Sequence, residues 1–180
     1  MRIPSFRFRH IVAAPLIALI LASCGPQKNV FAPACPVPGL LRPLGELARY
    51  EGASRDIRDL VVRARIVDIA GKCEPGDDDN TIVAKALVVV DAARGPRMKG
   101  DAITLPVFMA VTDAGAIRDK ILFTLPVEFP RNVDSARTAS QEIRMELPIT
   151  PQKSGAAYGI VAGFQLTPEE VAAWRRDHAR

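Results

Sequence analysis

Histidine and cysteine are scarce in this chain, which limits the chemistry that it can perform. The 180 residues include two histidines, His10 and His178, and three cysteines. A serine or cysteine nucleophile needs an imidazole that packing and a third group hold beside it. His178 lies two residues from the end of the chain, where a backbone is usually frayed. Histidine-based hydrolysis is therefore disfavoured, and we expect neither an enzyme activity nor a cofactor.

Motifs for phosphate, nucleotide and metal chemistry are absent as well. The chain has no Walker loop, no GxGxxG, GxSxG or HExxH motif, and no CxxC pair. The acidic run at residues 77–80 lacks the alternating ligands, the central glycine and the closing glutamate of an EF-hand loop. We interpret this run as a solvated hairpin loop, and we expect no metal site.

Long hydrophobic runs are limited to one, at residues 11–22. Its 12 residues fall short of the roughly 20 that a helix needs to span a bilayer. The run follows Arg2, Arg7 and Arg9 and ends in small residues, which is the order of a secretory signal peptide. We therefore expect residues 1–23 to be cleaved from the product.

The residues that end this run, Leu21-Ala22-Ser23-Cys24, resemble the lipobox of bacterial lipoproteins. The resemblance implies cleavage before Cys24, a thioether-linked diacylglycerol on its sulfur, and an acyl chain such as palmitate on its new amino group. Two or more acyl chains hold a protein on a membrane stably. Gly25 follows the cysteine where many inner-membrane lipoproteins have aspartate, so the resemblance implies the periplasmic face of the outer membrane. The inner membrane and an ordinary signal peptide remain alternatives.

A concentrated basic surface is lacking once the signal peptide is removed. The chain has 24 Lys and Arg against 20 Asp and Glu, and cleavage leaves 21 basic residues, for a formal charge of +1. Nucleic-acid binding needs basic residues clustered on one face. We therefore expect no nucleic-acid partner, and a membrane partner through the lipid anchor.

Proline is concentrated in residues 24–43, which contain Pro26, Pro33, Pro36, Pro38 and Pro43. Because proline favours extended chain, the ten residues 25–34 could reach roughly 30 Å at about 3.1 Å each. We assign residues 24–43 to a lipidated tether and residues 44–180 to one folded domain.

Two cysteines remain after lipidation, Cys35 and Cys73. Thiols in an exported protein meet an oxidising compartment, so we predict a disulfide between them. In the chain-entropy model a closed loop of about 39 residues stabilises the fold by roughly 4 kcal/mol. A thiol metal site is the alternative.

Alternating apolar residues predict strands in five segments: residues 60–67, 103–111, 121–129, 143–147 and 158–166. A sixth strand is predicted at residues 81–90, where the apolar run alternates less, as in a central strand covered on both sides. A seventh is expected near residues 47–50, and turn signals separate the segments. No long helical pattern intervenes. We predict an all-β fold, an antiparallel immunoglobulin-like β-sandwich of six to seven strands, with an open barrel as the alternative.

A short helix is expected at the end of the chain. Thr167 as the N-cap, Pro168 at the first helical position and Glu170 three residues after the cap form a capping box. Trp174, with Val171 one turn before it, either packs onto the sandwich or, together with Arg175-Arg176, forms a docking tip. Arg94, Arg97 and Lys99 crowd one turn and are candidate docking residues for anionic lipid or cell-wall polymer.

Four segments of the domain resemble a group of uncharacterised bacterial lipoproteins: Cys35-Pro36, Gly71-Lys72-Cys73, Arg94-Gly95-Pro96 and residues 163–170. The resemblance implies a sandwich domain and brings no activity. We expect a non-enzymatic, structural or accessory binding component of the cell envelope with an envelope protein partner. The alternatives are a small-ligand or metal-binding periplasmic module and, behind it, a hydrolase whose carboxylates pair in space.

Overall fold

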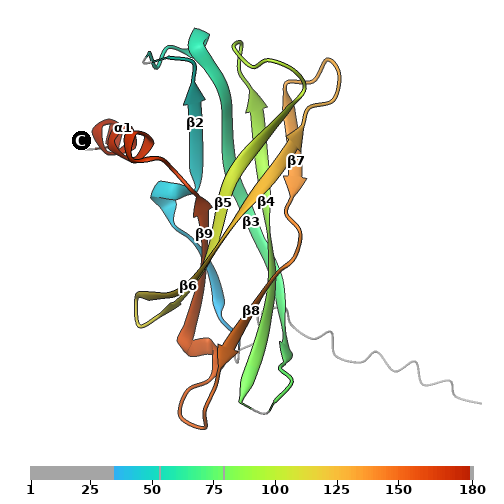
Figure 1. Ribbon diagram of the computed structural model, residues 1–180, viewed down its shortest axis with the longest axis vertical. Helices are drawn as coiled ribbons and strands as arrows, with labels where there is room; N and C mark the ends of the chain where they lie inside the picture. The colour runs from blue at the N-terminus through green and yellow to red at the C-terminus, as the bar shows by residue number, and fades with distance from the viewer. Residues whose placement is uncertain (1–34, 53, 79, 179–180) are drawn as a thin grey trace, which may run out of the picture.

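The computed structural model describes residues 35–52, 54–78 and 80–178, which form nine strands and one α-helix (Figure 1). The predicted β-sandwich with a short C-terminal helix is confirmed, with more strands than the six to seven that the sequence indicated. Cys24 and the predicted signal peptide lie outside the described residues. No helix in the described ranges is long and apolar enough to cross a membrane.

Two sheets form the sandwich. Sheet A has the order β1 (Val37–Leu40), β9 (Tyr158–Phe164), β5 (Ala102–Asp113) and β6 (Ala116–Glu128). Sheet B has the order β2 (Glu46–Tyr50), β3 (Leu60–Pro75), β4 (Thr81–Arg94) and β7 (Ser135–Ala139), and β8 (Ile143–Pro148) also pairs with β4. All pairs are antiparallel except β1 with β9, which is parallel.

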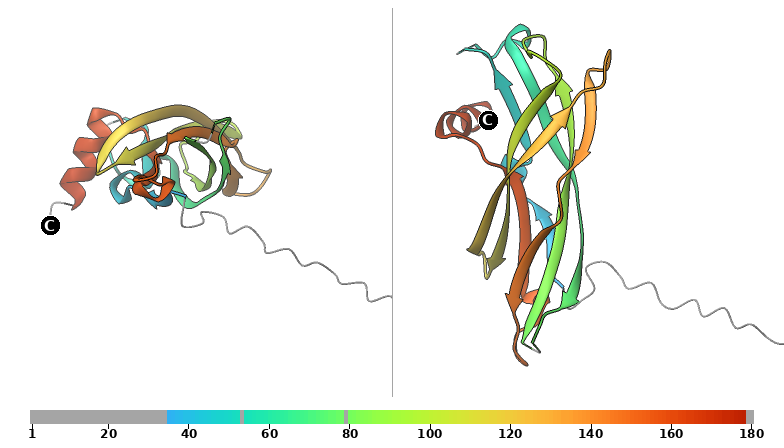
Figure 2. Two further views of the ribbon diagram at one scale, coloured as in Figure 1. Left: turned by 90° about the horizontal axis from the view of Figure 1, so that it is seen from below. Right: turned by 45° about the vertical axis from the view of Figure 1, so that its right-hand side comes forward.

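The core lies between the two sheets and follows the predicted alternation. On β3 the side chains of Val62, Ala64 and Ile66 are buried, and the intervening Arg63 and Arg65 face water. On β5, Leu105, Val107, Met109 and Val111 fill the opposite side of the core. Successive strand residues point to opposite faces, so one side of each sheet is shielded from water. Figure 2 shows β5 and β6 arching over the other strands when the molecule is seen from below.

Two strands lie where the sequence predicted none. β1 falls in the stretch that we assigned to the tether, and it pairs with β9 from Val37 opposite Gly159 to Leu40 opposite Ala162. β7 pairs with the last part of β4. Both strands are short, at four and five residues. Each forms by pairing with a strand distant in the sequence, and neither has a local apolar pattern that would predict it.

The helix α1 (Pro168–His178) begins with the predicted capping box. The backbone N–H of Thr167 donates to Oε2 of Glu170 at 2.8 Å, and the backbone N–H of Glu170 donates to Oγ1 of Thr167 at 3.2 Å. Nε of Arg49 on β2 lies 3.2 Å from Oε1 of Glu170, and Val171 packs against the core. The helix is therefore fixed beside β2, where Figure 1 draws it.

Candidate binding groove

A groove opens between the two sheets at the edge where β1 and β3 face each other. β2 pairs with β3 only from Leu60 to Arg65, and the pairing ends where the N–H of Ile66 donates to the carbonyl of Gly45 at 2.9 Å. Beyond that point this edge of β3 has no partner strand among the described residues. β1 belongs to the opposite sheet, so the gap between them is not closed by strand pairing.

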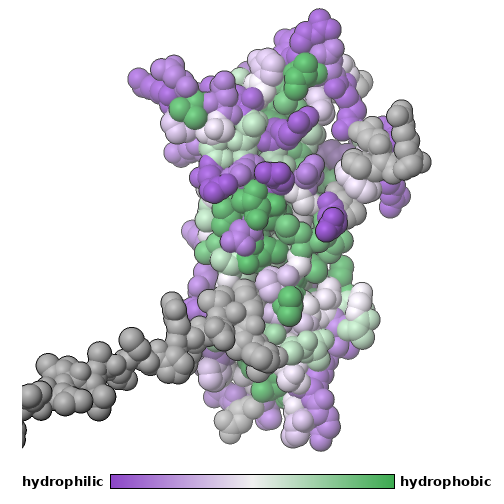
Figure 3. Space-filling model, turned by 180° about the vertical axis from the view of Figure 1, so that it is seen from behind, coloured by the Kyte–Doolittle hydropathy of each residue, from purple (hydrophilic) through white to green (hydrophobic). Residues whose placement is uncertain are grey.

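The groove has a volume of about 730 Å³ and is lined by both apolar and charged residues. Leu40 on β1 is 41% exposed, whereas Ile66 and Ile69 on β3 are buried beneath it. Figure 3 views the molecule from behind and shows hydrophobic residues gathered in the middle of that face, between more hydrophilic ends. Leu40 is therefore the large apolar side chain of the groove that solvent reaches.

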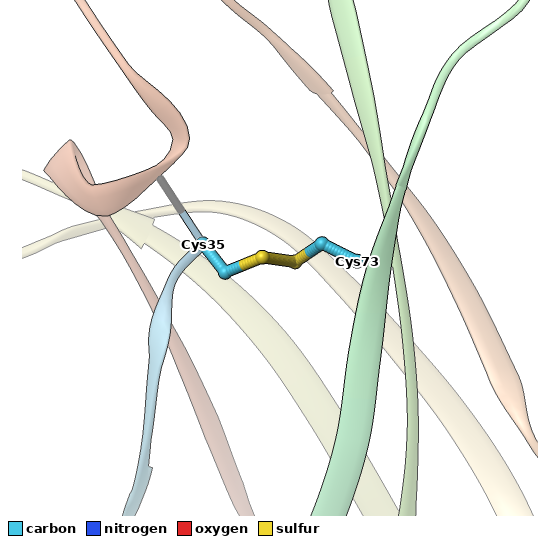
Figure 4. Close-up of a disulfide and its surroundings, with 2 residues drawn as sticks. All are labelled: Cys35 and Cys73. Carbon is cyan, nitrogen blue, oxygen red and sulfur yellow. A yellow bond between two sulfur atoms is a disulfide. The ribbon is translucent and has the colours of Figure 1, made fainter. Parts of the chain in front are cut away.

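A disulfide closes one end of the groove. Cys35, which is buried and directly precedes β1, bonds to Cys73 on β3, with 6.1 Å between their Cα atoms (Figure 4). The predicted disulfide is thereby confirmed. Because it joins the first strand of sheet A to sheet B, it holds the two walls of the groove together at this end.

Four charged residues line the groove, two of each sign: Arg42, Glu46, Arg65 and Asp68. No side-chain hydrogen bond or ion pair joins any of these four to another residue in the part of the chain described. Arg65 lies near Asp91 and helps to lower the pKa of that carboxyl, but it forms no ion pair with it. A charged side chain that forms no ion pair can bind an opposite charge on a ligand without first breaking an internal bond. An apolar centre with a charged border is a typical arrangement for a protein interface.

A second depression of about 590 Å³ lies on the outer face of sheet B. Arg63, Arg65 and Arg137 border it, and Ala93 and Ser135 also line it. Asp91 takes both hydrogen bonds of Arg137, at 2.6 and 2.8 Å, and these bonds lower the pKa of the Asp91 carboxyl. Asp91 therefore supplies a counter-ion within the depression, which attracts an anion less strongly than three arginines without a carboxylate would.

The candidate docking residues of the turn after β4 lie together but are neutralised locally. Nη2 of Arg94 lies 2.8 Å from Asp101, Nη2 of Arg97 lies 3.4 Å from Asp59, and Nζ of Lys99 lies 3.3 Å from Glu51. Arg94 also stacks on the ring of Phe129, 5.3 Å from its centroid. Each predicted cation thus has a carboxylate partner.

Trp174, the fourth candidate docking residue, lies half-buried on α1. The structure therefore brings the three cations together and holds the tryptophan on the helix. A docking role for these four residues stays a prediction.

The acidic side chains of the described residues are spread over the domain. No three side chains of His, Cys, Asp or Glu gather there in a group that could hold an ion. In the acidic turn after β3, Oδ1 of Asp78 accepts a hydrogen bond from the backbone N–H of Asn80 at 3.0 Å. That bond is typical of a hairpin turn.

The groove residues were missed by sequence reasoning. Leu40 and Arg42 lie in a proline-rich stretch, and Ile69 follows a register shift between Ile66 and Asp68, so neither wall has a local signature. Comparison of the chain with family models, with curated proteins and with solved structures finds no match.

Proposed function

We propose that this protein is a lipid-anchored component of the bacterial cell envelope that binds an envelope protein partner through the groove between β1 and β3. Its anchor is the lipid on Cys24, at the periplasmic face of the outer membrane, and its activity is binding without catalysis. The observation that supports the proposal is the groove itself, in which Leu40 is exposed and four charged residues make no side-chain hydrogen bond or ion pair with another described residue.

The groove suits a partner that presents an apolar side chain flanked by charges of both signs. Burial of such a side chain against Leu40 removes apolar surface from water, which stabilises the complex by about 25 cal/mol per Å². The unpaired edge of β3 offers backbone N–H and C=O groups to the same partner. Because the Cys35–Cys73 disulfide fixes the walls, little ordering is needed on binding, which favours affinity.

A small ligand is the second candidate occupant. The groove volume of about 730 Å³ lies within the range of roughly 300 to 1,000 Å³ that small-molecule sites occupy. The small-ligand proposal has the same anchor and the same groove as the protein-partner proposal. The two differ in whether a protein is recovered with this chain from cells.

The test is affinity purification after crosslinking in living cells. It uses the lipidated protein and three variants. Leu40→Asp places a charge in the groove, and Ile57→Asp is the matched control because Ile57 is 60% exposed on η2 (Ile57–Asp59), away from the groove lining. Cys24→Ala removes the anchor. Thermal unfolding of each variant checks that its domain is folded.

We expect wild type and Ile57→Asp to recover the same envelope protein, and Leu40→Asp to recover little of it. Cys24→Ala is expected to leave the membrane fraction. Equal recovery by Leu40→Asp would contradict the groove as the binding site. If folded, anchored wild type recovers no partner, the small-ligand candidate replaces the protein partner.

A further inference from the structure

The outer face of sheet A carries few charges, Lys120 and, toward the other end of β6, Glu128. Strand register places its outward side chains in rows that cross the sheet. The first row is Val37, Gly159, Thr112 and Ile117; the second is Gly39, Val161, Ala110 and Lys120; the third includes Gly163, Phe108 and Leu122. Lys120 is the single charged residue in these rows, and its Nζ lies 4.4 Å from the centre of the Phe108 ring.

Large apolar side chains at both edges of this face are open to solvent. Val37 on β1 is 72% exposed, and on β6 Ile117 is 62% and Leu122 is 61% exposed. These are the three highest values among the large hydrophobic side chains described. Apolar residues grouped in this way on one face mark a contact site for a protein or a membrane.

The outer face of sheet B has the opposite character. Its rows carry Arg63, Arg65, Lys85 and Asp91, and Arg137 lies opposite Asp91. Such a face is stable in water. The two faces of the sandwich therefore differ in the environment that each one suits.

The chain that precedes the domain enters it at Cys35, next to β1 of sheet A. Cys35 lies two residues before Val37, in the first row. The ten residues 25–34 between Cys35 and the anchor at Cys24 can extend over roughly 30 Å, at about 3.1 Å per residue. A bilayer that holds the lipid of Cys24 is thus within reach of the outer face of sheet A.

We propose that the outer face of sheet A rests on the bilayer to which the protein is anchored, with Val37, Ile117 and Leu122 entering the headgroup region. The inference builds on the proposed lipid anchor and adds an orientation to it. Shallow burial of apolar side chains strengthens the attachment of an anchored protein. The charged face of sheet B is then directed away from the membrane.

The test uses the lipidated protein in vesicles of phosphatidylethanolamine and phosphatidylglycerol. Spin labels are attached to Ile117→Cys, to Leu122→Cys and to the control Ile57→Cys, whose parent side chain is equally exposed at 60%. Collisions of each label with oxygen, which dissolves in lipid, and with a water-soluble nickel chelate report its depth. We expect the oxygen-to-nickel ratio to be several-fold higher at positions 117 and 122 than at position 57.

A second set of variants tests the face as a unit. Ile117→Asp combined with Leu122→Asp is expected to lower the ratio measured at Val37→Cys several-fold while the protein still sediments with the vesicles. Ile57→Asp is expected to leave that ratio unchanged.

Equal ratios at positions 57, 117 and 122 in sedimented protein would overturn the orientation and leave the anchor intact. Low collision rates with both reagents at positions 117 and 122 would place them against another protein copy and overturn it too. Protein that does not sediment with vesicles would overturn the anchor, and the orientation with it.

Discussion

Gly95 occupies a position where any side chain would collide with the backbone. A Cβ atom built there would lie 2.1 Å from the carbonyl oxygen of Leu60, and the N–H of Gly95 donates to the carbonyl of Val61 at 2.9 Å. At Gly45, which has a φ of −75°, the nearest atom would be 3.7 Å away. The two glycines therefore differ in how they tolerate alanine.

We expect Gly95→Ala to lower the free energy of unfolding by about 1 to 3 kcal/mol, the usual cost of overpacking. Gly45→Ala should change it by less than about 1 kcal/mol, in the stabilising direction, because alanine restricts the unfolded chain. Urea denaturation of both variants checks this, and equal stabilities would show that the loop at Gly95 shifts freely.

Glu74 has the largest pKa change among the carboxyl groups of the described residues. Hydrogen bonds from Lys85, at 2.5 Å, and from Lys72 lower its pKa from 4.5 to about 2. A carboxyl whose pKa is lowered by folding adds stability above its unfolded pKa and loses it as the pH falls through the folded value. This contribution is therefore present above about pH 4.5 and lost toward about pH 2.

Glu74→Gln should accordingly be less stable than wild type at pH 7, and the difference should shrink between pH 4.5 and 2. Denaturation curves across this range measure the effect. Glu128→Gln is the control, because Glu128 is exposed on β6 and has no ion pair with a described residue. A constant difference between Glu74→Gln and wild type at all pH values would contradict the pairing.

Burial of single residues was predictable where alternation is simple. The alternation predicts burial correctly from Leu60 to Ile66 on β3. It does not do so on β5, where Phe108 and Ala110 are buried although they face outward. Phe108 packs beside Gly163 and Leu44 and beneath Lys120. These contacts come from β9, from η1 (Arg42–Leu44) and from β6, so no local pattern in β5 indicates them.

At the scale of elements, β1 depends on long-range contacts. It pairs with β9, far along the chain, and the Cys35–Cys73 bond crosses 38 residues. Closing a loop of that length removes conformations from the unfolded chain. The disulfide therefore stabilises the strand that forms one wall of the groove.

We expect the paired change Cys35→Ala with Cys73→Ala to lower the free energy of unfolding by about 4 kcal/mol. Hydrogen exchange should also quicken in β1 more than in β4, which β3, β7 and β8 hold on both edges. Denaturation and mass-detected exchange measure the two effects. Unchanged protection of β1 would mean that β9 alone holds it.

The type of most elements could be predicted, because apolar alternation in long strands and a capping box are local signals. The strands β1 and β7 could not be predicted from local signals. Pro36 and Pro38 favour extended chain in a tether as much as in an edge strand, and only the position of β9 decides between them. In β7, Ser135, Arg137 and Ala139 face outward, so the segment resembles a loop.

For the whole molecule, the two-sheet sandwich could be predicted from the sequence, but the groove could not be predicted. Its lining includes Leu40 and Ile69, which lie on different sheets and come to the same groove only in the folded sandwich. The three cations after β4 were predicted as a docking surface, but the carboxylates of Glu51, Asp59 and Asp101 come from other segments and neutralise them. The groove and these ion pairs both depend on long-range placement, and the docking role of the cations stays a prediction.

Lipid anchoring at Cys24 is the claim on which the proposed function and the proposed orientation both depend. Mass spectrometry of the N-terminal peptide from membrane-purified protein tests it most directly. The account predicts a peptide that begins at Cys24 and carries the mass of a diacylglyceryl group and an amide-linked acyl chain. A peptide that begins elsewhere, or an unmodified Cys24, would contradict it.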